Sequence, residues 1–256
     1  MLLTPLEQFQ IISLFPVTFL NLDFSFTNSL LMSFLTLIFF NRIVYFFSSE
    51  TNYIGKEVFY LVPNTWQVFI ETIYDTVAQL LFDNINMEGE KYFPYVSMIF
   101  LFILFSNLSG LIPYSFTVTS HIVITFALSF SIFIGVNIIG VNKHGFNILS
   151  LIIPANSSFM VALILVPIEF LSYLAKPVSL GVRLFINLMA GHTLLKVIVG
   201  FAWSMLLLEN MVSFMHLIPL IILVVLMVLE LAVACIQAYV FTILVCIFLN
   251  DSINLH

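Results

Sequence analysis

The sequence predicts an all-α integral membrane protein of about six helices, and its composition and two very long apolar runs carry that prediction. Hydrophobic residues make up 62% of the 256 residues and charged residues only 8%, and the mean hydropathy is +1.17. Soluble domains contain about 25% charged residues. So large an apolar excess finds its natural solvent in lipid. Residues 1–256 are interpreted as a single membrane domain, because the sequence contains no repeat and no separating linker.

The first part of the chain predicts two helices of different kinds after an N-terminal segment, 1–28. Residues 29–47 are apolar except near one end and predict a membrane span. Residues 63–87 instead carry acidic side chains at helical spacing among apolar ones, which favours an interfacial amphipathic helix. Its acidic residues, Glu71, Asp75 and Asp83, are expected to face solvent or a protein partner.

Residues 93–140 predict two ordinary spans, about 93–114 and 118–140, and residues 141–145 read as a polar loop. The region 159–249 then contains two apolar runs, about 159–207 and 211–249. As helices they would be about 73 and 58 Å long, against a hydrocarbon core of about 30 Å.

Each long run could hide a tight hairpin of two spans. However, the second run has no Gly, Pro or Asn between Pro219 and Asn250, and a turn in lipid would leave backbone groups without partners. We therefore expect two long helices that are highly tilted and paired as an antiparallel hairpin.

Ionisable and polar residues lie inside both long runs. A charge at the bilayer centre costs at least about 2.5–3.5 kcal/mol, so such residues usually line a polar pathway. If the helices are antiparallel, residues at equal depth have position numbers of nearly constant sum. That rule pairs His192 with Glu230, Arg183 with Gln237, and Glu169 with Asp251. Lys176 and Lys196 are read as interfacial cations, while His216 and Asp251 could equally be solvated end residues.

The chemistry of these groups predicts proton movement. Carboxylates and histidine load and release protons, whereas arginine keeps its proton and acts as a fixed cation. Two titratable clusters separated by Arg183 would form two offset half-channels. A proton could then cross only on a carrier supplied by a second component.

Two stretches resemble a known family. The stretch from Lys176 to His192, with Arg183 and Asn187 at its centre, is similar to the signature of F-type ATP synthase subunit a, as is Glu230 to Phe241 with Gln237. The opening PLEQF and the NLSGLIP segment at 107–113 resemble the same family. The resemblance covers nearly the whole chain.

The resemblance implies a role for each site residue. Arg183 would face the carboxylates of a rotating c-ring; His192 and Glu230 would line the inlet; Glu169 and Asp251 would line the exit. Asn187 and Gln237 would be polar supports near the arginine. The implied partners are the c-ring, the peripheral stalk, other membrane-sector subunits and membrane lipid. The subunit would have no catalysis of its own, no cofactor and no metal.

The implied location is the mitochondrial inner membrane, with a bacterial plasma membrane as the alternative. A net charge of −6 with scattered cations gives no nucleic-acid footprint. A secondary transporter would predict repeats and broken helices. A structural subunit of a respiratory complex would explain the composition but leave the motif around Arg183 unexplained.

Overall fold

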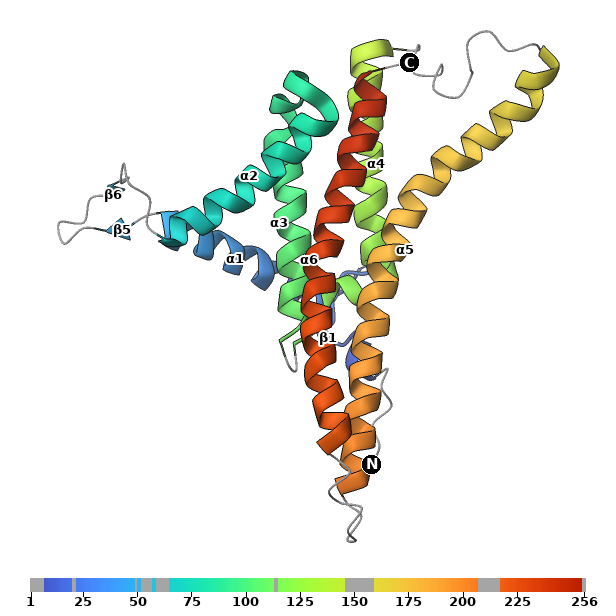
Figure 1. The fold of residues 1–256 in the computed structure, drawn as a ribbon. Coiled ribbons are helices and arrows are strands. Elements are labelled where there is room, and N and C mark those ends of the chain that lie inside the picture. The colour runs from blue at the N-terminus through green and yellow to red at the C-terminus, as the bar shows by residue number, and fades with distance from the viewer. Residues whose placement is uncertain are drawn as a thin grey trace. The chain divides into compact units, whose positions relative to one another are not determined.

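The computed structural model describes residues 7–19, 22–48, 50–51, 57–58, 65–112, 115–145, 159–206 and 217–254. Six α-helices dominate this part of the chain (Figure 1) and confirm the all-α fold class. They are α1 (Asn28–Ser48), α2 (Thr65–Ile85), α3 (Phe93–Gly110), α4 (Ile122–His144), α5 (Phe159–Leu206) and α6 (Leu217–Ile253). Three short 3-10 helices accompany them: η1 (Glu7–Phe9), η2 (Asn86–Tyr92) and η3 (Val118–Ser120).

Four helical segments are long and apolar enough to cross a membrane: Gly89–Gly110, Ile122–His144, Leu163–Leu206 and Leu217–Ile253. The predicted span at 29–47 is a helix with nearly those bounds, α1. Only its first part, Asn28–Phe39, qualifies as a shorter apolar helix among the residues described. That α1 crosses the membrane therefore stays a prediction.

Both long apolar runs are single helices, as expected. α5 continues for 48 residues with Pro167 and Pro177 inside it, and α6 continues for 37 residues. Neither contains the tight hairpin that was the alternative. Proline removes one backbone hydrogen bond and crowds the preceding turn, so α5 has two points at which it can bend. At 1.5 Å per residue both helices exceed a bilayer core of about 30 Å, and their strong tilt stays a prediction.

The region between α3 and α5 differs from the expectation at one point. Residues 141–145 are not a polar loop, because α4 runs on to His144 and is followed directly by Gly145, whose φ is 60°. Glycine adopts this left-handed conformation without strain and commonly ends helices. The extra turn is held in place, since a ring nitrogen of His144 donates to the carbonyl of Ile253 at 2.6 Å.

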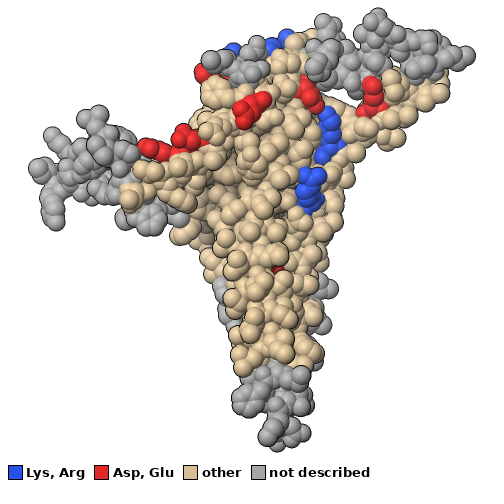
Figure 2. Space-filling view, viewed as in Figure 1, with Lys and Arg blue, Asp and Glu red and all other residues tan. Residues whose placement is uncertain are grey.

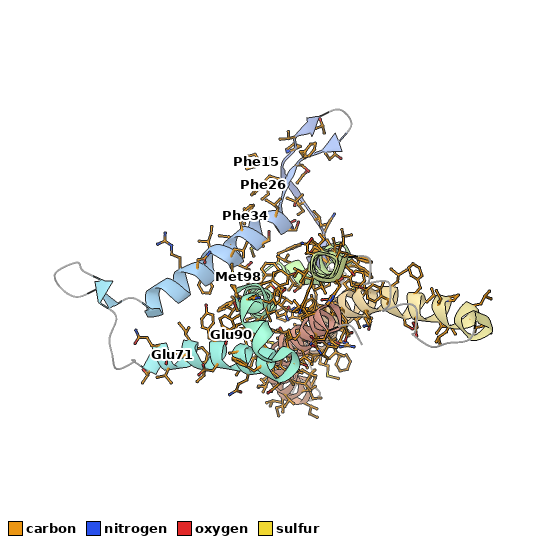
Figure 3. All side chains as sticks on the ribbon, turned by 90° about the horizontal axis from the view of Figure 1, so that it is seen from above. Phe15, Phe26, Phe34, Glu71, Glu90 and Met98 are labelled. Atoms are coloured by element: carbon orange, nitrogen blue, oxygen red, sulfur yellow. The ribbon has the colours of Figure 1, made fainter. Side chains whose placement is uncertain are left out.

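The N-terminal segment contains short strands that the sequence did not predict. β1 (Ser13–Phe15) pairs with β4 (Phe26–Thr27), and β2 (Thr18–Phe19) pairs with β3 (Leu22–Asp23), both antiparallel. Asn28 joins them to α1, because its side chain accepts from the amide of Ile12 and donates to the carbonyl of Gln10. Figure 3 shows Phe15 and Phe26 together on this hairpin, with ring centroids 6.5 Å apart. A further pair, β5 (Glu50–Thr51) with β6 (Glu57–Val58), follows α1.

The chain forms two compact units, each assembled from three segments. Unit 1 contains Met1–Thr36, Ile103–Thr125 and Val182–Ala238. Its buried residues include Asn107, Leu184 and Ala234, so the end of α3 packs with the adjoining halves of α5 and α6. Apolar side chains elsewhere on these halves face outward; Val228 is 66% exposed. Such a surface suits lipid or a neighbouring subunit.

Unit 2 contains Leu37–Phe102, Phe126–Gly181 and Tyr239–His256. In it, α2 buries Val77, Leu81 and Ile85, which recur every four residues. Its acidic residues Glu71 and Asp75 are exposed, as predicted for the amphipathic helix at 63–87. Figure 2 shows acidic side chains along α2, and Figure 3 shows Glu71 on it.

Candidate functional site

In unit 1 the structure brings together the polar residues of the C-terminal half of α5 and the N-terminal half of α6. Asn187 donates through Nδ2 to Oε1 of Gln237 at 2.8 Å, and Gly191 lies directly against the Glu230 carboxylate. We call His192, Glu230, Asn187, Gln237 and Asn107 the His–Glu cluster. A cavity of ≈ 20 Å³ opens among them and is lined by Asn107, Leu111, Asn187, Leu188, Gly191, His192, Glu230, Val233, Ala234 and Gln237.

The cavity is suited to water. Nε2 of His192 and both carboxylate oxygens of Glu230 are buried and have no hydrogen-bond partner within the described residues. A void needs roughly 10–15 Å³ and two to four polar partners to hold one water molecule. The cavity meets both conditions. A water here would give the imidazole and the carboxylate a hydrogen-bonded path for exchanging a proton.

Asn107 is a member of this cluster that the sequence analysis did not single out as a site residue. It lies on α3 and is fully buried. Its Nδ2 donates to the carbonyl of Ala234 at 3.4 Å, and its Oδ1 accepts from the hydroxyl of Thr119 at 3.3 Å. The signal that could have found it is a lone amide side chain near the end of an apolar span.

A second polar group lies in unit 2, where Lys176 of α5 meets Asp251 of α6. Their Nζ and Oδ2 atoms are 2.9 Å apart. The ion-pair partner of Asp251 is thus Lys176, about two turns further along α5 than Glu169. That Glu169 lies at the depth of Asp251 stays a prediction. Glu169 is partly exposed and makes no ion pair among the residues described. The reading of Lys176 as an interfacial cation missed this pairing.

Gln237 bonds Asn187, one turn further along α5 than Arg183, and the position of Arg183 beside Gln237 stays a prediction. The bonded residue on α5 is one turn from the equal-depth position at Gln237 and about two turns from it at Asp251. A constant sum assumes parallel axes, whereas packed helices usually cross at an angle. Figure 1 shows the first turns of α5 leaning away from α4 and α6, and this stretch carries Glu169.

Arg183 lies between the two polar groups along α5, about two turns after Lys176 and two and a half turns before His192. Its side chain is half-buried. Among the described residues it has no hydrogen-bond or ion-pair partner. A half-buried guanidinium in an apolar segment raises the free energy of the folded protein unless it is paired or hydrated. Arg183 is therefore a fixed positive charge without a counter-charge in the part of the chain that the structure describes.

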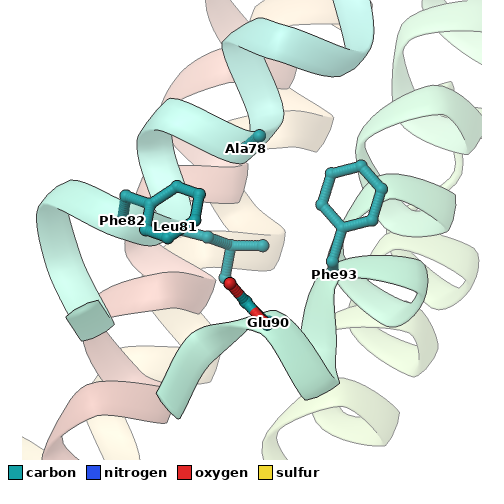
Figure 4. A pocket seen from close by; sticks show the side chains of 5 residues that line it. All are labelled: Ala78, Leu81, Phe82, Glu90 and Phe93. Carbon is teal, nitrogen blue, oxygen red and sulfur yellow. The ribbon is translucent and has the colours of Figure 1, made fainter. Parts of the chain in front are cut away.

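The remaining sequence candidates lie elsewhere. Lys196 is half-buried on α5, and His216 lies outside the described residues. In unit 2 an apolar groove of ≈ 290 Å³ is lined by Ala78, Leu81, Phe82, Glu90 and Phe93. Figure 4 shows Phe93 across this groove from Leu81 and Phe82. No residue of the His–Glu cluster lines it.

Comparison with known proteins points to one family. The family model described as ATP synthase A chain matches residues 29–250. "ATP synthase subunit a" of Chondrus crispus is 48% identical over 253 residues, covering 99% of this chain and 97% of the relative. The proteins of the same name from Marchantia polymorpha and Pylaiella littoralis are 48% and 49% identical, with 99% of both chains covered in each case.

These matches confirm the family that the motifs around Arg183 and Glu230 resembled, and they extend over nearly every residue. The four candidate spans agree with a multi-pass inner-membrane protein. The chain belongs to the ATP synthase A chain family and is a non-catalytic subunit of the membrane sector of a proton-transporting ATP synthase.

Proposed function

We propose that this chain forms two offset proton half-channels beside a rotating c-ring and so converts proton flow into rotation for ATP synthesis, in the mitochondrial inner membrane. The observation that carries the proposal is Arg183, a half-buried guanidinium without a partner in the described part of its own chain. A carboxylate on the c-ring would supply the missing counter-charge. The peripheral stalk, other membrane-sector subunits and lipid would cover the remaining surface.

The inlet half-channel would be the His–Glu cluster of unit 1. A proton arriving from the proton-rich side would bind the Glu230 carboxylate or the His192 imidazole, whose buried polar atoms share one small cavity. It would then pass to a deprotonated c-ring carboxylate. The side-chain amides of Asn187, Gln237 and Asn107 would give this route fixed polar walls. The first two are hydrogen-bonded to each other, and Asn107 is hydrogen-bonded to the backbone of Ala234.

The exit half-channel would involve Glu169 and Asp251. A protonated c-ring carboxylate is neutral and can turn through lipid at little electrostatic cost, whereas an ionised one cannot. On reaching the exit side it would release its proton, become ionised and be attracted to Arg183. Since the guanidinium keeps its own proton, it cannot relay one and so prevents a direct leak between the half-channels.

The role of the inlet is tested with Glu230→Gln in the whole complex, reconstituted in vesicles. The change keeps the shape of the side chain but removes the group that binds the proton. We expect much slower ATP synthesis and slower ATP-driven proton pumping, with no passive proton leak. Glu71→Gln, on the exposed face of α2, is the matched control and should leave both rates unchanged. Normal rates in an assembled Glu230→Gln complex would contradict the inlet assignment.

A further inference from the structure

Lys176 sits in a cage built from α5 and α6 within unit 2. Its Nζ is 2.9 Å from Oδ2 of Asp251, 5.2 Å from the ring centroid of Phe248 and 5.7 Å from that of Tyr173. A void of ≈ 10 Å³ adjoins the pair. An ammonium within about 6 Å of an aromatic face is attracted to it. Lys176 is therefore held both by a carboxylate and by two rings.

The cage is fixed from α4 as well. The Tyr173 hydroxyl donates to Oδ1 of Asn137, and Nδ2 of Asn137 donates to the carbonyl of Phe133 at 2.9 Å. The rings of Phe133 and Tyr173 also pack at 4.9 Å between centroids. Because Asn137 is anchored to its own helix, the Tyr173 ring has a set orientation whether or not the ion pair is formed.

The ion pair alone would stabilise the contact between α5 and α6 only modestly, since both side chains are about one-third exposed, 34% for Lys176 and 35% for Asp251. The two aromatic faces add a second attraction for the ammonium. They attract the ammonium independently of the carboxylate, so the ammonium keeps a binding place when the carboxylate is neutralised by a proton.

We propose that Lys176 is a positioning residue of the exit half-channel. It orients the ionised Asp251 carboxylate as a proton acceptor, and its ammonium stays bound between the Tyr173 and Phe248 rings while Asp251 carries a proton. This inference rests on the proposed function and deepens it. The proton from the c-ring carboxylate adds to an oxygen of Asp251, giving a neutral carboxyl group. When that proton leaves to water, the carboxylate is ionised again and re-forms the pair. Lys176 keeps its own proton throughout.

Other titratable groups lie on the helices packed here. Tyr173 faces Lys176 from α5, and on α4 His144, which follows Lys143, bonds the carbonyl of Ile253, two residues beyond Asp251. Asn137 is uncharged. The ion pair that the described residues show at Asp251 is the one with Lys176.

The test uses the whole complex in vesicles and measures both the amount of assembled complex and ATP synthesis per complex. Lys176→Met should slow synthesis per complex several-fold, because Asp251 then lacks the group that orients it. Lys176→Arg should restore the rate. If Lys176→Met lowers only the amount of complex, or if Lys176→Arg is as impaired as Lys176→Met, the positioning role is wrong.

The cage has its own variant. Phe248→Leu removes one ring but leaves the ion pair, and we expect a smaller slowing of ATP synthesis. Phe170→Leu, at an exposed aromatic on α5, is the control and should leave the rate unchanged. Unchanged ATP synthesis by the Phe248→Leu complex would contradict the role of the two rings. Arg183→Ala, assayed in parallel, separates the two proposals. Synthesis lost there but normal in Lys176→Met refutes this inference alone, whereas synthesis retained in Arg183→Ala refutes the proposed function.

Discussion

The Glu230 carboxylate rests against the backbone of Gly191: a Cβ atom on that glycine would lie 2.6 Å from Oε1. Gly191 has no side chain, so the Glu230 carboxylate can approach the backbone of α5 directly before His192, which carries the imidazole. This close approach brings the two proton-binding groups to one cavity. A methyl group at position 191 would displace the end of a flexible side chain and leave the helix intact.

Gly191→Ala should therefore assemble normally and transport protons poorly. Alanine favours helix over glycine by about 1 kcal/mol, so the fold is not expected to suffer. Amounts of complex and ATP synthesis per complex measure the two effects separately. Gly200→Ala is the matched control, because a Cβ atom there meets nothing within 4 Å. Equal synthesis by the two variants would show that the position of Glu230 is not critical.

Gly110→Ala should instead impair assembly. A Cβ atom at Gly110 would lie 2.6 Å from Cγ2 of Thr117, and Thr117 is buried with its hydroxyl bonded to Ser120. The methyl group therefore has little room to move. The double variant Gly110→Ala/Thr117→Ser removes Cγ2 while keeping the hydroxyl, and it should recover the amount of complex in the membrane. Failure of the second change to restore assembly would place the strain elsewhere.

His121 should make stability depend on pH. Its ring stacks on Phe116 at 5.0 Å, and burial lowers its pKa from the ordinary value of 6.5. The unfolded chain then binds more protons than the folded one near and below that pH, so stability present above it is lost on acidification. Glutamine does not titrate, so His121→Gln should lessen the fall in thermal stability of the purified complex between about pH 7 and pH 5. Parallel curves for both proteins would contradict this.

The long helices could be predicted from the sequence because their cause is local. An apolar run without a turn residue, such as α6 after Pro219, has no way to reverse inside lipid. The start of α5 at Phe159 was also as expected. The end of α4 was missed because Lys143, His144 and Gly145 resemble a loop. The same residues suit a helix C-terminus, where basic side chains and a glycine are favoured.

The partners across the hairpin could not be predicted from position numbers. The groups that bond Asp251 and Gln237 are Lys176 and Asn187, one to two turns from the equal-depth positions. Helix crossing and bending are set by packing and by Pro167 and Pro177 rather than by spacing. Asn107 was missed for a related reason. Its role depends on Thr119 and Ala234, which are brought to it only by the tertiary fold.

The most direct test of the account is ATP synthesis by the assembled complex carrying Arg183→Ala, reconstituted in vesicles. With the fixed cation gone, a c-ring carboxylate has no reason to ionise between the half-channels. We predict that synthesis is abolished while the complex still assembles, and that protons leak passively. Arg183→Lys should also abolish synthesis, because a lysine can lose its proton when desolvated. Substantial ATP synthesis by an assembled Arg183→Ala complex would contradict the account.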